Sequence, residues 1–402
     1  MNGWKTNKLS SLGVIQTGST PKTSVKDNFG NFIPFIKPSD FQPDGEIKYK
    51  NDGLSEKGLA ESRLIKQNSV VMVCIGATIG KVGYTTIDVS SNQQINSFTP
   101  FDGLITKYCY YAMLNDSFKR RVIFNSGQAT LPIINKTKWS NLELTYPDDI
   151  EEQKRIVAIL DQAFADIEQA RAKTEQNLLN ARELFESYLQ QVFSQRGEGW
   201  EIKKVSEVAE TFLGKMLDKK KNKGTLKSYL RNLNVQWFDI GTSDLLEMRF
   251  EDSEHERYAI KKGDLVVCEG GYPGRGAIWE QEENIFFQKA LHRIRCHNEV
   301  YNRWILYYLY LSDCNGNLKK SFTGAGIQHF TGKALKQLSL PIPNAKLAEE
   351  YVSNFDNLLG KIKCLENVYH QKLDSIDELK KSILHLAFTS KLTRNKTKGA
   401  AA

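Results

Sequence analysis

Two glycine-rich loops, each ending in a basic residue, carry the most suggestive chemistry in this sequence. Gly76–Lys81 reads GATIGK and Gly270–Arg275 reads GGYPGR. Each loop follows a run of β-branched and apolar residues that is typical of a buried strand. Glycine lets the backbone approach a ligand closely, and the terminal Lys or Arg adds positive charge, so both loops could contact phosphates or the edges of bases. The alternative interpretation, two tight turns that follow strands, stays open.

Neither loop fits a nucleotide-binding fingerprint. In the first loop the spacing is one residue short of a P-loop, and no Ser or Thr follows Lys81. The second loop is not followed by a covering helix with a later acidic residue, as the dinucleotide fingerprint requires. We therefore expect neither loop to bind a nucleotide cofactor.

One acidic segment, PDDIEEQK, imitates the metal site of a nuclease. Asp148, Glu152 and Lys154 fall within seven residues at a predicted helix start. Side chains so placed cannot converge around Mg²⁺ as carboxylates from separate strands do. The histidines His255 and His292 are isolated from any candidate nucleophile. We therefore expect no catalytic residue and no metal site.

Several polar side chains near predicted turns have the chemistry that reads nucleic acid. Arg and Lys match the guanine edge, Asn and Gln match the adenine edge, and lysine runs bind phosphates without reading sequence. The candidates in the first half of the chain are Lys22, Lys37, Gly76, Gly80, Lys81, Gln93, Gln94, Asn96, Gln128 and Thr130. Those in the second half are Lys215, Arg231, Asn232, Gly270, Gly274, Arg275, Gln288, Lys289, Arg293, Gln328 and His329. The basic runs are Lys119, Arg120 and Arg121, and Lys219, Lys220, Lys221, Lys223 and Lys227. For each of them, a solvated surface residue without any such contact stays open.

Composition and charge limit the classes of protein to which this chain can belong. The 402 residues include 55 Lys and Arg against 47 Asp and Glu, which gives a formal net charge of +8. This mild excess suits polyanion binding through patches. No segment has the length of apolar sequence that a membrane span or a signal peptide needs, so we expect a cytoplasmic protein. The six cysteines are scattered without a Cys-x-x-Cys pair, and we expect reduced thiols.

Two long helices are the elements that would position these residues. Between Pro147 and Gly197 the chain contains no Pro or Gly, and apolar residues recur at steps of four and three. At about 1.5 Å per residue this helix is roughly 65 to 70 Å long. The pattern returns from about 344 to 392, with Phe355 lying 195 residues after Leu160. We predict an antiparallel coiled coil whose interface residues are Phe164, Ile167, Leu178, Phe185, Tyr188, Phe355, Leu359, Ile362, Leu373, Ile376 and Ile383.

Arg171 and Glu366 interrupt the two apolar rows at equivalent positions of the repeat. In an antiparallel pair, two such residues need not touch. We therefore claim no ion pair between them.

The segments that precede the helices also repeat each other. Trp200 and Gly214 stand 196 residues after Trp4 and Gly18, while most residues between such landmarks differ. We predict an α+β protein with two similar β-rich domains joined by two long helices, in an internal pseudo-two-fold repeat. The predicted boundaries are 1–146 and 197–343 for the domains, 147–196 and 344–396 for the helices, and 397–402 for a tail. A helix is expected over 106–124 within the first domain.

This ordered repeat resembles the specificity subunit of type I restriction-modification systems. The first helix start carries Pro147 and Glu151–Gln153, and the chain closes with the helix end LHLAFTSKLT at Leu384–Thr393. The resemblance covers nearly the whole chain. One departure is that the second helix start has Ala345–Leu347 where the first has an acidic run, so its contacts to a partner are expected to differ.

The resemblance implies a DNA-binding subunit without catalytic activity of its own. Each domain would be a target recognition domain that reads one half of a bipartite, asymmetric target in double-stranded DNA. The helix pair would set the spacing between half-sites and dock two modification (methyltransferase) subunits, and restriction/translocase subunits would join the complex. S-adenosylmethionine, ATP and Mg²⁺ are expected on those partner subunits, with no cofactor on this chain and no membrane partner.

A second class of function explains the helices equally well. A coiled-coil scaffold without catalysis could use its β-rich domains to bind protein or glycan. The divergence of two domains on one frame, together with the basic glycine loops, favours a reader of two unlike half-sites. Because phosphate contacts weaken as salt rises, binding that ignores ionic strength would favour the scaffold.

Overall fold

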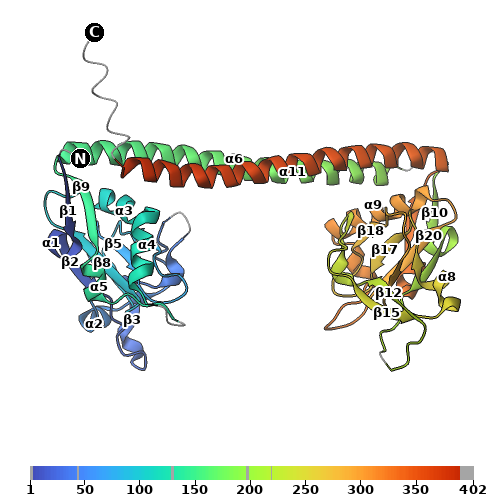
Figure 1. The fold of residues 1–402 in the computed structure, drawn as a ribbon, viewed down its shortest axis with the longest axis horizontal. Helices are drawn as coiled ribbons and strands as arrows, with labels where there is room; N and C mark the ends of the chain where they lie inside the picture. Colours follow the sequence, from blue (N-terminus) through green and yellow to red (C-terminus); the bar gives the residue numbers. More distant parts are fainter. Residues whose placement is uncertain (1–2, 43–44, 128–130, 196–198, 219, 390–402) are drawn as a thin grey trace, which may run out of the picture. The chain divides into compact units, whose positions relative to one another are not determined.

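The computed structural model describes every residue except 1–2, 43–44, 128–130, 196–198, 219 and 390–402. The chain forms two compact units: unit 1 comprises Met1–Thr174 and Gln371–Ala402, and unit 2 comprises Glu175–His370. Each unit combines a β-rich domain with segments of two long helices, α6 (Ile150–Ser194) and α11 (Ala345–Ala387) (Figure 1). The helices predicted over 147–196 and 344–396 are therefore each shared between the two units.

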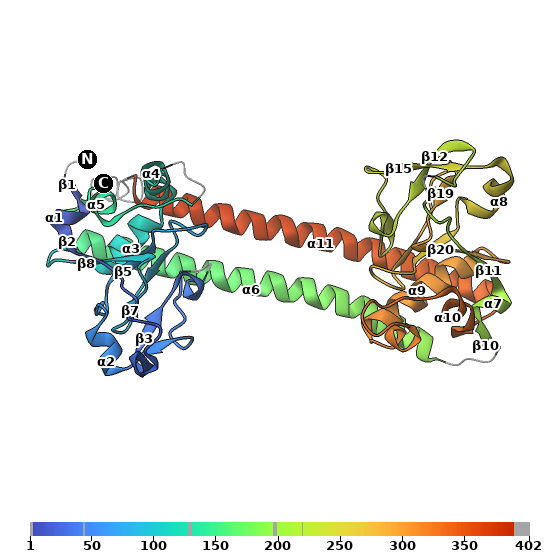
Figure 2. The same cartoon turned by 90° about the horizontal axis from the view of Figure 1, so that it is seen from below.

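Unit 1 is built on an antiparallel sheet of strand order β2-β8-β5-β6. A second sheet has the order β4-β3-β7, and β1 pairs with β9. Helix α2 packs on β3 and β4 (Figure 2). The strands are β1 (Trp4–Lys8), β2 (Gly13–Thr17), β3 (Phe29–Ile36), β4 (Gly53–Leu54), β5 (Val70–Val73), β6 (Val82–Tyr84), β7 (Ser90–Ser91), β8 (Ile95–Pro100) and β9 (Glu143–Pro147). The shorter helices are α1 (Leu9–Leu12), α2 (Glu56–Ala60), α3 (Thr106–Leu114), α4 (Asp116–Asn125) and α5 (Lys136–Ser140).

Unit 2 is built on a sheet of strand order β11-β20-β17-β18, with a second sheet β15-β12-β19-β16 and the pairs β10-β21 and β13-β14. Its strands are β10 (Glu201–Lys204), β11 (Ala209–Leu213), β12 (Thr225–Leu230), β13 (Val235–Gln236), β14 (Asp239–Ile240), β15 (Leu246–Phe250), β16 (Ala259–Ile260), β17 (Leu265–Cys268), β18 (Gly276–Ile278), β19 (Ile285–Phe287), β20 (Leu291–Cys296) and β21 (Ser339–Ile342). The shorter helices are α7 (Val205–Val208), α8 (His255–Tyr258), α9 (Val300–Cys314) and α10 (Gly332–Gln337).

The two domains share one sheet topology, which confirms the predicted repeat. The sheet order β2-β8-β5-β6 recurs as β11-β20-β17-β18. The parallel pair of β3 with β7 recurs as β12 with β19, and the closing pair β1-β9 recurs as β10-β21. The apolar runs VVMV and LVVC form β5 and β17, and all of their side chains are buried, as expected of strands in a sheet interior.

The repeated glycines Gly18 and Gly214 have a common physical reason. A Cβ at Gly18 would lie 2.2 Å from the carbonyl oxygen of Asn92, and a Cβ at Gly214 would lie 2.1 Å from that of Gln288. Any side chain would collide with this backbone, so both domains need glycine where these two segments cross.

The helix predicted over 106–124 is two helices. α3 ends at Leu114 and α4 begins at Asp116, with Asn115 in an extended conformation between them. The Asn115 side chain accepts a hydrogen bond from the Ser117 N–H at 2.9 Å. This cap satisfies a free N–H at the start of α4 and makes a new helix start favourable inside an otherwise helical pattern.

α6 and α11 begin where their sequences contain helix-start signals. α6 has Glu151 and Glu152 in its first turn, and the Asp149 carboxylate accepts a hydrogen bond from the Glu151 N–H at 3.0 Å. These charges face the positive end of the helix dipole. Pro147, predicted as the helix start, instead ends β9. Among the described residues no helix is both long and apolar enough to cross a membrane.

Candidate nucleic-acid interface

In unit 1, the first glycine loop meets the segment that precedes α5. The Gly76 N–H donates to the carbonyl of Pro132 at 3.0 Å, and the Ile134 N–H donates to the carbonyl of Cys74 at 2.9 Å. These bonds hold two distant parts of the sequence side by side. We call this feature edge 1 and define it by residues 75–81 and 131–134.

Unit 2 repeats the arrangement. The Phe330 N–H donates to the carbonyl of Glu269 at 2.8 Å, which joins the second glycine loop to the segment that precedes α10. Within that segment Thr323 and His329 exchange two backbone hydrogen bonds of 2.9 Å, so it forms a short hairpin. We call this feature edge 2 and define it by residues 269–275 and 322–330.

The glycines of both loops are needed for their backbone conformation. Gly76 and Gly80 have φ angles of 99° and 84°, in the left-handed region that other residues rarely adopt. In unit 2 that region is occupied by Gly271 and Gly274, with φ angles of 80° and 87°. The predicted equivalence of Gly270 with Gly76 is thus corrected by one residue, because Gly271 makes the turn.

Edge 1 carries amide groups and a cation beside its loop. Gln93 is exposed and accepts a hydrogen bond from the Thr20 hydroxyl at 2.7 Å. The half-buried Gln94 amide nitrogen lies 3.9 Å from where a Cβ would sit on Gly76. Lys119 of α4 is exposed, and its Cγ lies 3.2 Å from the Cβ position of Gly80. The two other candidates, Gln128 and Thr130, lie outside the described residues.

Edge 2 presents a different set of side chains. Gln328 and His329 are both exposed. The His329 Nδ1 atom lies 3.2 Å from the Cβ position of Gly270, so the imidazole lies directly against the glycine loop. Edge 2 thus carries an imidazole against its loop, at the position that matches Ile133 in edge 1.

The polar residues behind edge 2 hold its loop in place. Arg275 donates to the carbonyl of Asn232 at 3.1 Å and stacks on Tyr272, with its guanidinium carbon 5.0 Å from the ring centroid. Asn232 in turn donates to the carbonyl of Gly270 at 3.2 Å. Arg231 is bonded to Asp244 through a carboxylate oxygen at 2.6 Å and the carbonyl at 2.7 Å. Arg275 is half-buried, and Tyr272 beside it is exposed.

Two of the predicted DNA contacts do not reach the surface. Asn96 on β8 is 2% exposed and accepts a hydrogen bond from the Thr17 hydroxyl at 2.7 Å. Arg293 on β20 is 1% exposed and donates to the carbonyls of Ala259 at 2.6 Å and Glu256 at 3.1 Å. Burial lowers the pKa of its guanidinium. Both residues are corrected to parts of the fold, because their side chains are buried in it.

Lys215 is a third correction. It is 8% exposed, its ammonium donates to the carbonyl of Arg249 at 3.0 Å, and it pairs with the Glu254 carboxylate at 2.5 Å. The same nitrogen lies 5.1 Å from the centroid of the Phe250 ring. With its charge compensated inside unit 2, Lys215 is not available to a phosphate.

The remaining single candidates vary in availability. Lys22 and Lys289 are exposed, and Gln288 is half-buried. Lys37 forms an ion pair with Asp52 at 2.9 Å. Lys81 is half-buried and its Nζ lies 3.4 Å from the carbonyl oxygen of Phe41.

The two basic runs remain candidates for phosphate contacts. Lys119 and Arg120 are exposed on α4, whereas Arg121 donates to the carbonyl of Glu143 at 3.1 Å. In the second run Lys220, Lys221 and Lys223 are exposed, Lys227 is half-buried, and Lys219 lies outside the described residues.

Sequence reasoning missed two exposed apolar side chains at the edges. Leu131 in edge 1 is 52% exposed and Ile327 in edge 2 is 75% exposed. Ile327 stands 196 residues after Leu131, so the two occupy matching places. The sequence does contain a signal for them, which is an apolar residue at matching places in two loops of otherwise small and polar residues. Such a residue is expected to be exposed, because the loop offers no core in which to bury it.

Each domain is fixed to a long helix by a matching polar cluster. In unit 1 the Tyr111 hydroxyl donates to the Asp161 carboxylate, which also pairs with Lys107 at 2.7 Å. Burial, followed by this carboxylate, raises the pKa of Tyr111. α3 thus lies against α6 through charged and aromatic groups (Figure 1).

Unit 2 builds the same cluster on α9 and α11. The Tyr307 hydroxyl donates to the Asp356 carboxylate, which pairs with Arg303 at 3.2 Å. Burial first, and then the Asp356 carboxylate, raises the pKa of Tyr307. The corresponding residues are offset by 195 or 196 positions in the sequence, so both domains are fixed to their helices in the same way.

Gln153 fixes the start of α6 to its domain. It is fully buried, its amide donates to the carbonyls of Gly103 at 3.0 Å and Pro147 at 2.9 Å, and its oxygen accepts from the Ile105 N–H at 2.9 Å. Ala348 stands at the matching place in α11 and is also fully buried. The sequence departure at the second helix start therefore replaces a hydrogen-bonded amide with a packed methyl group.

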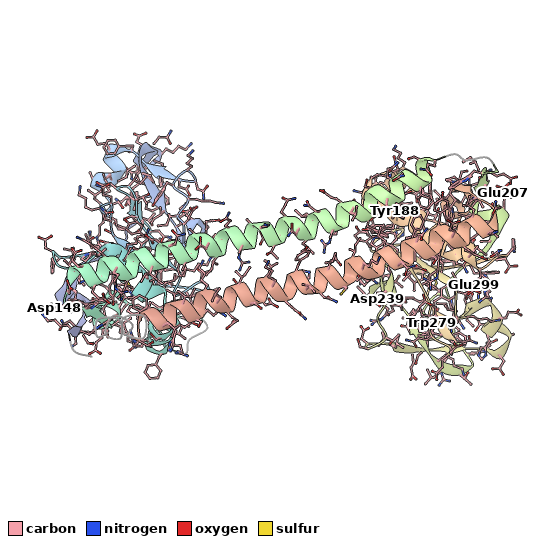
Figure 3. All side chains as sticks on the ribbon, turned by 90° about the horizontal axis from the view of Figure 1, so that it is seen from above. Asp148, Tyr188, Glu207, Asp239, Trp279 and Glu299 are labelled. Atoms are coloured by element: carbon pink, nitrogen blue, oxygen red, sulfur yellow. The ribbon has the colours of Figure 1, made fainter. Side chains whose placement is uncertain are left out.

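The predicted coiled-coil residues are all buried or half-buried. In unit 1 Ile167 and Ile376 are buried and Phe164, Leu373 and Ile383 are half-buried. In unit 2 Phe185, Phe355 and Ile362 are buried and Leu178, Tyr188 and Leu359 are half-buried. Figure 3 labels Tyr188 on α6, where its ring meets Phe355 of α11 with centroids 5.6 Å apart.

The apolar rows do more than join the helices. Phe164 packs edge-on against Tyr111 of α3 at 5.3 Å, and Phe185 packs edge-on against Tyr307 of α9 at 6.0 Å. Phe164 and Phe185, predicted to lie between the helices, therefore also pack on the domains. A helix that carries a domain at its end must bury part of its apolar row on that domain.

The nuclease-like segment is dispersed in the structure. Asp148 pairs with Lys5 at 2.7 Å, Glu152 with Arg155 at 2.7 Å, and Lys154 with Glu151 at 2.7 Å. Figure 3 labels Asp148 just before the start of α6. Within the described part of the chain no three His, Cys, Asp or Glu side chains converge as a metal site would require.

The sequence matches one family model twice. The model described as the type I restriction modification DNA specificity domain matches residues 1–176 and 197–371. The MjaIX specificity subunit of a type I restriction enzyme from Methanocaldococcus jannaschii is 26% identical over 230 residues, covering 52% of this chain and 52% of the relative. The HindI specificity subunit from Haemophilus influenzae is 32% identical over 188 residues, covering 45% of this chain and 40% of the relative. These alignments span about half, or less, of the length of the two relatives.

A solved structure shows the same fold over nearly the whole chain. It belongs to work on complex assembly and conformational transition of the type I R-M system, and it covers 97% of this chain and 99% of its own with a TM-score of 0.81. The sequence identity is 13%. The likeness therefore concerns the arrangement of helices and strands.

Proposed function

We propose that this chain, which belongs to the family defined by the type I restriction modification DNA specificity domain, is the DNA-recognition subunit of a type I restriction-modification complex. It carries out no catalysis itself. Each β-rich domain reads one half of a bipartite, asymmetric target, with edge 1 facing one half-site and edge 2 facing the other.

The observation that supports this proposal is that the two domains share one backbone arrangement but carry different side chains at edge 1 and edge 2. The same kind of backbone bond joins the glycine loop to the second loop in both domains. The side chains at these edges differ, with Gln94 and Lys119 beside the loop of edge 1 and with His329 and Arg275 in edge 2. Because base edges are read by side-chain donors and acceptors, unlike sets on one frame would read unlike sequences.

The partners follow from the same proposal. Two modification subunits dock on the helix pair and restriction/translocase subunits complete the complex in the cytoplasm. S-adenosylmethionine, ATP and Mg²⁺ are bound by those partners. The two helices set the distance between half-sites, which recur on one face of the duplex every ~34 to 36 Å.

The test is to sequence methylated DNA, molecule by molecule, from cells that make this chain with its cognate partners. The expected result is one methylated motif made of two different half-sites separated by a fixed gap. A single continuous motif, or a palindromic one, would contradict the proposal.

A second measurement separates DNA recognition from scaffolding. The complex of this chain with its modification subunits should bind duplex DNA with an affinity that falls steeply between about 50 and 200 mM salt, because phosphate contacts release counterions. Binding that ignores ionic strength would instead favour a scaffold for protein or glycan.

A further inference from the structure

Two ion pairs join α6 to α11, and they occupy equivalent positions in the repeat. In unit 1 Arg171 pairs with Asp377, and in unit 2 the Arg182 Nε atom lies 2.5 Å from Glu366 Oε1. Glu366 stands 195 residues after Arg171, and Asp377 stands 195 residues after Arg182. Each member of one pair is thus the repeat counterpart of a member of the other.

At these four positions each helix carries charges of one sign. Both α6 positions are arginine, and both α11 positions are acidic. A helix that paired with a second copy of itself in the same antiparallel register would place its two positions opposite each other. For α6 this means Arg171 against Arg182 of the other copy, twice per dimer, and for α11 it means Glu366 against Asp377, also twice.

We infer that these residues form a charge code by which α6 accepts α11 and rejects a second copy of α6, while α11 rejects a second copy of itself. The surface concerned is the α6–α11 interface, and the partner it excludes is the equivalent helix of a second copy of this chain. Such codes are a known means of setting partners in coiled coils.

A third position strengthens the preference. Lys380 pairs with Glu168 at 2.9 Å in unit 1. The repeat counterpart of Glu168 is Lys363. If α11 paired with another α11, Lys380 would face Lys363 of the other copy, which adds a like-charge contact to those already described.

The apolar contacts do not supply this discrimination. Tyr188 meets Phe355 in unit 2, and their repeat counterparts Ile383 and Leu160 pack in the same apolar core of unit 1. Apolar side chains of this kind would pack in a pair of like helices as well as in a pair of unlike ones. The polar positions must therefore decide which helices pair.

The side chains are accessible enough for the code to depend on salt. The exposed fractions are 27% for Arg171, 54% for Asp377, 49% for Arg182 and 24% for Glu366. A single pair at this exposure contributes little by itself. The discrimination comes from changing several contacts from complementary to repulsive at once, and it weakens as added salt screens them.

The pairing preference does not depend on what the domains bind. Its consequence rests on the proposed function: two unlike domains always serve one DNA target, and two copies of one domain do not combine to read a palindrome. Failure of the code would leave DNA recognition itself untouched.

Two full-length variants with the same net charge test the code. In R182E/D377R both intrachain contacts at these four positions become repulsive. Between like helices the contacts at the same four positions become complementary, while Lys380 against Lys363 stays repulsive in a pair of α11 helices. In R182E/E366R both intrachain contacts stay complementary, so the chain can still pair its own helices at high effective concentration. The measurement is sedimentation equilibrium after unfolding and refolding, at about 50 mM and 500 mM salt, which span weak and strong screening.

At low salt, R182E/D377R should dimerise with a dissociation constant about tenfold or more below that of R182E/E366R, since several weak pairs change sign together. The difference should shrink at high salt. The fourfold swap R171D/R182E/E366R/D377R, in which α6 is acidic and α11 basic, should associate no more than the wild-type chain.

Equal association of the two double variants would overturn the inference. If R182E/D377R does not fold, R182E alone takes its place, because it retains the pair between Arg171 and Asp377. Equal association of R182E and R182E/E366R would then overturn it. DNA recognition is assayed separately by methylation, so the two proposals can fail independently.

Discussion

Units 1 and 2 hold their domains on the long helices through matching tyrosine–aspartate contacts, but they present different side chains at the edges proposed to meet DNA. Tyr111 and Tyr307 make equivalent hydrogen bonds to Asp161 and Asp356. The residues at edge 1 and edge 2, by contrast, share glycines and backbone bonds and little else. The difference teaches that the tyrosine–aspartate contact to the helix is common to both units, while the surface proposed to read DNA differs between them.

The comparison extends into the strands. β8 and β20 occupy the same place in their sheets, with Asn96 paired to Thr17 and His292 paired to Leu213 in equivalent registers. Unit 2 therefore buries an imidazole, and beside it Arg293, where unit 1 buries neutral residues. The same sheet order therefore accommodates different polar side chains in its interior.

The largest difference between the two units is expected when a charge replaces Phe185 in unit 2. Its repeat counterpart is Lys380, a charge that unit 1 accommodates through Glu168. Phe185 is 2% exposed among aromatic rings, so Phe185→Asp should lower the free energy of unfolding of unit 2 by about 4 kcal/mol through an uncompensated buried charge. Thermal unfolding measures the loss. The neighbouring Leu184→Asp, at a 60% exposed position, should change little, and equal losses would contradict the packing described.

A smaller loss of stability is expected when Gln153, at the start of α6, is replaced. Gln153→Ala makes unit 1 resemble unit 2 at this place but leaves the Ile105 N–H and two carbonyls without partners. The expected loss is about 2 kcal/mol in the free energy of unfolding. The control is Gln162→Ala on the same helix, where the exposed amide donates to Asp166 within α6. A Gln153→Ala variant as stable as that control would show that the amide is dispensable.

A substitution of Ile327 tests whether edge 2 contacts its half-site. Ile327→Ser should leave unfolding unchanged, because the side chain is 75% exposed. If edge 2 faces its half-site, the variant should reduce methylation of the target about tenfold, as expected when one good contact is lost. The matched control is Phe124→Ser, at an 87% exposed position outside both edges. Equal effects of the two substitutions would remove Ile327 from the DNA interface.

His292 predicts a difference in acid sensitivity. Burial lowers the pKa of His292 below its ordinary value of 6.5, and its Nε2 lies 2.8 Å from the carbonyl oxygen of Phe330. The neutral ring is favoured in the folded state, so below about pH 6.5 the unfolded chain binds the additional proton and stability falls as pH falls.

The measurement is amide hydrogen exchange in β20 and β8 at pH 7.5 and 5.5, corrected for intrinsic rates. Protection in β20 should fall at the lower pH more than protection in β8, where Asn96 does not titrate. The variant His292→Asn should remove most of the difference. Parallel losses in the two strands would show that His292 has no such effect.

Much of the frame could be predicted because it depends on periodicity. The offset of 195 to 196 residues, the buried runs at β5 and β17 and the apolar rows of α6 and α11 are local patterns that survive in one sequence. The break between α3 and α4 was not visible, because Asn115 is polar in either a helix or a cap. The adjacent Gly270 and Gly271 could not be told apart, since only the observed φ angles assign the turn.

The interface was harder to predict for a different reason. Lys215 and Arg293 are residue types that often contact DNA, yet inside unit 2 they donate hydrogen bonds to groups from distant segments. Lys215 binds a carbonyl and a carboxylate, and Arg293 binds carbonyls. No local sequence pattern predicts such partners. Leu131 and Ile327 were missed because an apolar residue in a loop is first assigned to a core, and only the structure shows that they are exposed.

The most direct test of the central claim is to replace residues 197–343 with a second copy of residues 1–146 and to map the methylated target. The copied Lys107 and Tyr111 match Arg303 and Tyr307, so the contact with Asp356 is retained. We expect a symmetric target in which the first half-site appears twice, in inverted orientation and with a fixed gap. A target that still contains the second half-site would show that residues 197–343 do not read it.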